Sequence, residues 1–139
     1  MSHIAKIELE IKSLEDLKAA CETLGLKFLE EQKTYKWFGK WIGDTPMPDG
    51  VKIEDLGKCD HCIHVPGATY QIGVVQQGNS YRLLWDYWQS GGLEKILGEN
   101  AGLLKQAYAV ATIKRESRKK SLRLREQVKG GTIRLTITV

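Results

Sequence analysis

The densest group of chemically reactive side chains is the segment Cys59-Asp60-His61-Cys62-Ile63-His64. Its two thiols and two imidazoles match the ligand types and the number of ligands of a structural zinc site. The spacing argues against a closed site, because an extended backbone sends Cys59 and His61 to one face and Cys62 and His64 to the other. A zinc ion held by these four residues would therefore need a further segment or a second subunit.

The same segment allows two further interpretations. In the structural one, a strand or loop enters the core with Cys62, Ile63 and Val65. In the chemical one, Cys59 is a nucleophile, because the neighbouring lysine and His61 could lower its pKa. The sequence shows no third residue that would orient this pair. It also contains no Gly-x4-Gly-Lys-Ser/Thr loop and no Gly-x-Gly-x-x-Gly motif, so nothing positive supports an enzyme.

A second group of functional side chains is a basic run in the last third of the chain, which contains a single acid, Glu116. It supplies seven of the 21 basic residues of a chain with net charge +4: Lys114, Arg115, Arg118, Lys119, Lys120, Arg123 and Arg125. The positive charge is therefore local. The run is either the solvated face of a helix and strand, or a site for a phosphate-bearing ligand or acidic protein, or, least favoured, a long nucleic acid.

Aromatic residues add a possible stacking surface. Trp37 and Trp41 flank glycines in an irregular region, where they could line a ligand pocket or make an oligomer contact. Trp85 alternates into a strand and is expected in the core.

Local patterns predict the elements that position these residues. Ile7, Leu9 and Ile11 alternate with charged residues, which predicts a strand. A helix is predicted over 14–24, with Ser13 as its N-cap and Gly25 as its stop. The other predicted elements are a strand at 26–30, a strand or half-hairpin at 35–42, a loop at 43–57, a hairpin at 70–85 around Gly78-Asn79, a short helix at 93–97, a helix at 102–119 with Leu104, Ala107, Tyr108 and Ala111 facing inward, and a hairpin of strands at 122–125 and 132–139.

This order predicts an α+β fold in which two main helices cover a mostly antiparallel sheet, in a ferredoxin-like arrangement or an elaboration of it. With 139 residues, the chain is expected to be a single domain (1–139) with an irregular insertion at about 35–66. No apolar run approaches the length of a membrane span and no leader pattern follows Met1, which favours a cytoplasmic protein with no membrane partner. The odd number of cysteines, three, favours a reducing compartment.

Several segments together resemble one protein family. They are Met1-Ser2-His3-Ile4, the helix from Leu14 to Gly25, Tyr70-Gln71-Ile72-Gly73-Val74, Tyr87-Trp88, Gln106-Ala107-Tyr108-Ala109 and Gly131-Thr132-Ile133-Arg134-Leu135. The chain resembles the plastid and cyanobacterial reading-frame proteins of the Ycf type and their bacteriophage relatives, grouped as domain of unknown function 1257. The stretch from Trp37 to Val65 is longer than in the compact plastid members. The resemblance implies a similar fold and supplies no activity or catalytic residue.

Together these observations favour a non-catalytic binding protein for a small anionic, nucleotide-like ligand. The residues predicted to bind it are Lys114, Arg115, Arg118, Arg123, Arg125, Trp37 and Trp41. The chief alternative is a protein-interaction or homo-oligomerisation module that uses exposed hairpin edges and no small ligand. The third hypothesis is a metal or thiol enzyme centred on Cys59 and His61, and zinc would be a cofactor only there.

Overall fold

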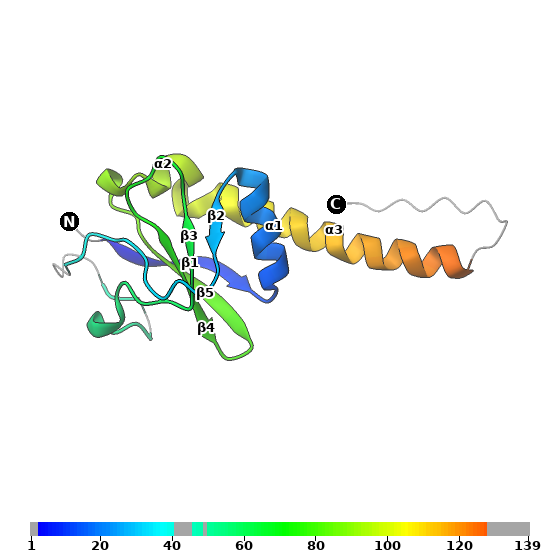
Figure 1. Cartoon of the computed structure of the whole chain (residues 1–139), viewed down its shortest axis with the longest axis horizontal. Coiled ribbons are helices and arrows are strands. Elements are labelled where there is room, and N and C mark those ends of the chain that lie inside the picture. The colour runs from blue at the N-terminus through cyan, green and yellow to red at the C-terminus, as the bar shows by residue number, and fades with distance from the viewer. Residues whose placement is uncertain (1–2, 41–45, 49, 128–139) are drawn as a thin grey trace.

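The computed structural model describes residues 3–40, 46–48 and 50–127, without the side chains of 122–127. These residues form a sheet with helices on one face and an irregular segment on the other (Figure 1). The strands are β1 (Ile4–Ile11), β2 (Lys27–Leu29), β3 (His61–His64), β4 (Ile72–Gln77) and β5 (Ser80–Asp86). The α-helices are α1 (Leu14–Leu24), α2 (Leu93–Leu97) and α3 (Gly102–Gln127), and short 3-10 turns lie at Ile53–Asp55, Gln89–Gly91 and Glu99–Ala101.

The strand order within these residues is β1-β5-β4-β3-β2, and every neighbouring pair is antiparallel. The predicted α+β class, with helices packed on an antiparallel sheet, is therefore confirmed. The detailed order differs from a ferredoxin-like sheet, in which the first strand lies inside the sheet. Here β1 and β2 occupy opposite edges, and α1 connects them.

Two local signals in the sequence act as predicted. The Ser13 hydroxyl accepts a hydrogen bond from the Asp16 backbone N–H at 3.2 Å and caps α1, and Gly25 ends the helix with a left-handed φ of 73°. Gly78-Asn79 joins β4 to β5, so that Gln77 pairs with Ser80. The predicted strand at 26–30, the hairpin and the short helix at 93–97 are thus all present.

Alternation along the strands sends side chains into two cores. Ile72, Val74, Leu83 and Trp85 point to the helix face, where they pack with buried residues of α1 and α3; we call this the helix-side core. Leu84 points to the opposite face, where residues of the irregular segment cover it. This loop-side core contains Ile4, Tyr35, Val51, Leu56, Cys59, Cys62 and Leu84. Trp85 is a core residue, as predicted.

Three predicted segments differ from the structure or reach beyond the described residues. The strand or half-hairpin predicted at 35–42 is wrong for residues 35–40, which are irregular, and residues 41 and 42 lie outside the described part. The strand predicted at 122–125 is also wrong, because α3 continues to Gln127 and projects well past the rest of the fold (Figure 1). The short alternation there is outweighed by a run of good helix formers. The strand predicted at 132–139 lies outside the described residues.

The predicted insertion at 35–66 contains β3, which pairs with both β2 and β4 and so lies inside the sheet. Cys62, Ile63 and Val65 are fully buried, as the structural interpretation of that segment predicted. In the described part of the chain, no helix combines the length and the apolar character required to cross a membrane.

Candidate functional site

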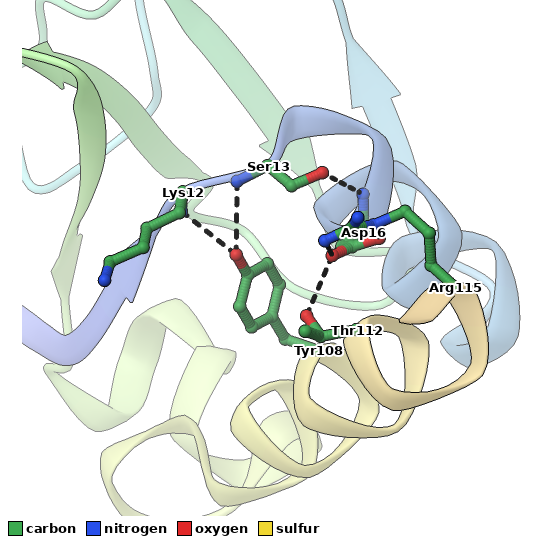
Figure 2. Close-up of polar contacts among 6 residues, drawn as sticks. All are labelled: Lys12, Ser13, Asp16, Tyr108, Thr112 and Arg115. Atoms are coloured by element: carbon green, nitrogen blue, oxygen red, sulfur yellow. Dashed lines mark hydrogen bonds and ion pairs between the residues drawn. The ribbon is translucent and has the colours of Figure 1, made fainter. Parts of the chain in front are cut away.

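A polar joint fixes α3 against the start of α1 (Figure 2). Tyr108, Thr112 and Arg115 lie on one face of α3, spaced four and three residues apart. The Tyr108 hydroxyl accepts hydrogen bonds from the backbone N–H groups of Lys12 (3.0 Å) and Ser13 (3.3 Å). One turn further along, Thr112 and Arg115 bind the side chain of Asp16, so one face of α3 holds the whole β1–α1 junction.

The Asp16 carboxylate is 2% exposed and bound on both oxygens. Arg115 donates from Nε to Oδ1 at 2.8 Å and from Nη2 to Oδ2 at 3.0 Å, and the Thr112 hydroxyl donates to Oδ2 at 2.8 Å. Burial by itself would raise the pKa of Asp16. The hydrogen bonds and the charge of Arg115, helped by Thr112 and Ser13, outweigh burial and hold this pKa below its ordinary value.

The sequence Ser13-x-x-Asp16 has the spacing of a capping box, in which the acid at the third helical position returns to the N-cap backbone N–H. Here the Tyr108 hydroxyl takes that N–H instead. The Asp16 carboxylate is therefore free to bind Thr112 and Arg115. This exchange commits Arg115 to a structural ion pair and removes it from the cations that could meet a ligand.

Beside this joint, a groove of about 380 Å³ runs between α1 and α3. We call it the α1–α3 groove. Its α1 wall consists of Glu15, Asp16, Ala19, Thr23 and Leu24. Its α3 wall consists of Leu103, Gln106, Ala107, Val110, Ala111, Lys114 and Arg118. Small side chains on both helices leave this space open, since Ala19 belongs to one wall and Ala107 and Ala111 belong to the other.

The groove is charged at one end only. Lys114 and Arg118 lie one turn apart on α3, at the end where α1 begins and where its positive dipole end is located. Glu15 and Asp16 also line this end, but Arg115 neutralises Asp16. Two cations against one uncompensated carboxylate leave a net charge of about +1.

The structure brings together part of the predicted basic site. Lys114 and Arg118 line the α1–α3 groove, whereas Arg115 is bound to Asp16. Arg123 and Arg125 were expected on a strand that follows the helix, but they lie on the last turns of α3. Arg123 is five residues beyond Arg118, or about 7 Å further along the axis, and the side chains of both lie outside the described part.

The predicted aromatic residues are not brought to these cations. Trp37 packs against the loop-side core, next to Gly57, so the sheet separates it from α3. Trp41 lies outside the described residues. Trp37 lies in the irregular segment that covers one face of the sheet, whereas the basic run lies on α3 on the other face.

The Cys59–His64 segment is largely buried. The predicted placement of Cys59 and His61 on one face is wrong, because Cys59 precedes β3 and does not follow its alternation. Cys59 packs with Cys62 in the loop-side core, whereas the His61 ring lies against Phe28 and Tyr81 at the helix-side core.

The polar atoms of this segment are engaged locally. The Cys59 thiol donates to the Gln32 carbonyl at 3.2 Å, and His61 Nδ1 accepts from the Glu31 backbone N–H at 2.9 Å. Burial raises the pKa of Cys59 to about 11 and that of Cys62 to about 12. Neither thiol is thus activated as a nucleophile. Among the residues described, no three His, Cys, Asp or Glu side chains are grouped to hold a metal ion.

Sequence reasoning missed the residues that shape the groove. It did not single out Asp16, Ala19 or Val110 as parts of a site. Two signals were present: the capping-box spacing of Ser13 and Asp16, and the row Gln106, Val110, Lys114 and Arg118, in which every member is four residues from the next. Compared with known proteins, the chain matches no protein-family model, no curated protein and no solved structure.

Proposed function

We propose that this chain is a non-catalytic binding protein for a small anionic ligand and that the α1–α3 groove is the binding site. The observation that carries the proposal is the placement of Lys114 and Arg118 together at one end of a groove of about 380 Å³. Spaces of this size are typical of small-ligand pockets, in which a few polar groups orient a ligand against an apolar lining.

The spacing of the two cations suits one anion. Lys114 and Arg118 are four residues apart, so their backbones differ by about 6 Å along α3 and their side chains share a face. A phosphate between them would accept charge-assisted hydrogen bonds from both. After the cost of association, two such contacts correspond to roughly 4 kcal/mol, or a millimolar Kd for the anion alone.

A nucleotide base has less support than the phosphate. Within the described groove lining there is no aromatic side chain, and Trp37 is on the other side of the sheet. The proposal therefore specifies only the anionic group of the ligand, which is bound by charge and shape and not by aromatic stacking.

Isothermal titration calorimetry with methyl phosphate in low-salt buffer tests this proposal. The wild-type chain should bind with a millimolar Kd that weakens as salt is added. The double variant Lys114→Gln/Arg118→Gln should bind at least tenfold more weakly. The matched control is Lys119→Gln/Lys120→Gln, which removes the same charge from exposed positions outside the groove lining and should stay within twofold of wild type. An equal loss of affinity in both double variants would show that methyl phosphate responds to the overall positive charge and not to a site in the groove.

One observation favours a second candidate, an interaction module. β1 has eight residues and, within the described residues, pairs along one side only, with β5. An edge strand of this length offers backbone groups for strand addition, although the exposed charges of Lys6, Glu8 and Glu10 oppose indiscriminate pairing. A mass measured by light scattering after size exclusion would separate the candidates, because strand addition between copies predicts a dimer.

A reducing, cytoplasmic location is proposed as well, supported by Cys21, Cys59 and Cys62, which are buried free thiols. The proposed kinship with the Ycf-type family is supported by the sequence segments alone. An experimental structure of a plastid member with the order β1-β5-β4-β3-β2 would support it, and a different order would remove it.

A further inference from the structure

We infer that the ligand of the α1–α3 groove is a single-chain anionic amphiphile, such as an alkyl phosphate or a fatty acid. This inference rests on the proposed function and specifies the part of the ligand that the cations do not touch. It follows from the composition of the groove along its length, which changes from charged to uncharged and mostly apolar.

The other end of the groove carries no charge and is mostly apolar. Leu24 of α1 and Leu103, Ala107, Val110 and Ala111 of α3 line it, with Thr23 and Gln106 as its polar members, and Leu103 is 48% exposed. A leucine so exposed on a helix that otherwise buries Leu104 and Tyr108 leaves apolar surface in water. An alkyl chain lying in the groove would cover that surface.

The groove has the direction and length of such a molecule. Lys114 is eleven residues beyond Leu103, so the cationic end lies about 16 Å from the apolar end along α3. A headgroup at Lys114 and Arg118 would direct its chain past Val110 and Ala107 toward Leu103. Thus charge and apolar character are arranged head to tail along the walls of the groove.

The walls of the groove favour a small amphiphile over a partner helix. An α-helix is about 10 Å across. The Asp16–Arg115 ion pair joins α1 to α3 beside the groove, so a helix would lie over the groove and not within it. An extended alkyl chain is much thinner than a helix and can lie between Ala19 and Ala111 without separating α1 from α3.

Chain length is the measurable consequence. Complete burial of a methylene group raises affinity about fourfold, and a groove that covers half of each group gives roughly twofold per methylene. Decyl phosphate should therefore bind about 60-fold more tightly than butyl phosphate, because it has six more methylenes. Titrations by calorimetry are run with methyl, butyl, octyl and decyl phosphate, each below its micellar concentration, and with decanoate to compare headgroups.

A variant that fills the groove tests the location. Ala19 is exposed on α1 and lines the groove, so Ala19→Leu should fill it without disturbing the core and should lower the affinity for decyl phosphate at least tenfold. Methyl phosphate should bind this variant as it binds wild type. The matched control is Ala109→Leu, since Ala109 is exposed on α3 and lies outside the groove lining. It should not change the affinity for any of these ligands.

Each outcome separates this inference from the proposed function. Binding of methyl phosphate that depends on Lys114 and Arg118, with no gain from longer chains, overturns the amphiphile and keeps the anion site. If the wild-type chain binds none of these phosphates, both the amphiphile and the anion site are overturned. Tighter binding to vesicles of anionic lipid than to monomeric decyl phosphate, unchanged by Ala19→Leu, would indicate a membrane surface and also overturn the inference.

Discussion

Replacing Asp16 by asparagine should destabilise the protein more than any other loss of one charge in the first turn of α1. The carboxylate is 2% exposed and accepts three side-chain hydrogen bonds from Thr112 and Arg115. Asparagine has nearly the same shape and keeps one acceptor oxygen. The substitution therefore removes the charge and the two-pronged contact with Arg115 while leaving the packing of α1 in place.

The magnitude follows from the burial of the two partners. Hydrogen bonds to a charged group contribute about 1.5–3 kcal/mol each, and removing one partner of a fully buried pair costs about 3–5 kcal/mol. The Arg115 side chain is 25% exposed, so water can rehydrate its guanidinium after the loss. The expected loss is therefore about 2 kcal/mol in the free energy of unfolding. At this chain length, that corresponds to a Tm lower by roughly 7 °C.

Urea unfolding followed by circular dichroism measures this loss, with Glu15→Gln as the control. Glu15 precedes Asp16 in the same helical turn but is exposed, so its loss should change the unfolding free energy by less than about 0.5 kcal/mol. Arg115→Gln combined with Asp16→Asn should add little to Asp16→Asn alone, because both remove the same contact. Equal effects of the Asp16 and Glu15 substitutions would refute the claim that Arg115 is held by a buried partner.

Three further predictions concern pH, packing and thiol chemistry. The folded-state pKa of Asp16 lies below its unfolded value, so its contribution to stability is complete above the unfolded pKa and is lost as the pH falls through the folded pKa. In acid unfolding, the difference in stability between wild type and Asp16→Asn should therefore narrow below about pH 4. A difference that stays constant with pH would contradict this. A Cβ on Gly73 would collide with the Tyr35 ring, so Gly73→Ala should lower the free energy of unfolding by about 1–3 kcal/mol in a urea titration. In the control Gly102→Ala, the added Cβ has no neighbouring atom within 4 Å, so this variant should be neutral or stabilising. Burial raises the pKa of Cys59 to about 11, and those of Cys21 and Cys62 to about 12. At pH 8 a thiol reagent should therefore label the native chain far more slowly than the urea-unfolded chain. Rapid labelling of Cys59 in the native chain would show that it is a reactive thiol.

The elements that the sequence predicted well carry local signals. Ser13 and Gly25 delimit α1, and Gly78-Asn79 joins the hairpin, because caps and turns act over a few residues. The strand order was not accessible in this way. β1 pairs with β5 through residues such as Ile4 and Asp86, which are separated by most of the chain, and no local pattern specifies that pairing. The end of α3 was mistaken for a strand because alternation over four residues is too short to exclude a helix.

The candidate site was predicted in part for the same reason. A run of cations is visible in any sequence, so Lys114 and Arg118 were found. Their neighbour Arg115 could not be excluded, because its partner Asp16 lies 99 residues away. The groove itself depends on Ala19, whose side chain carries no chemical signal. Trp37 was assigned to the same site because its sequence context does not reveal which face of the sheet it covers.

The most direct test of the central claim is a ¹H–¹⁵N correlation spectrum recorded while methyl phosphate is added to the labelled chain. The account predicts that the shifted signals belong to the cationic end of the α1–α3 groove, around Lys114 and Arg118 on α3 and the first turn of α1. The shifts should be absent from Lys114→Gln/Arg118→Gln and present in Lys119→Gln/Lys120→Gln. Shifts centred on the Trp37 indole N–H, or no saturable shift at these residues, would contradict the account.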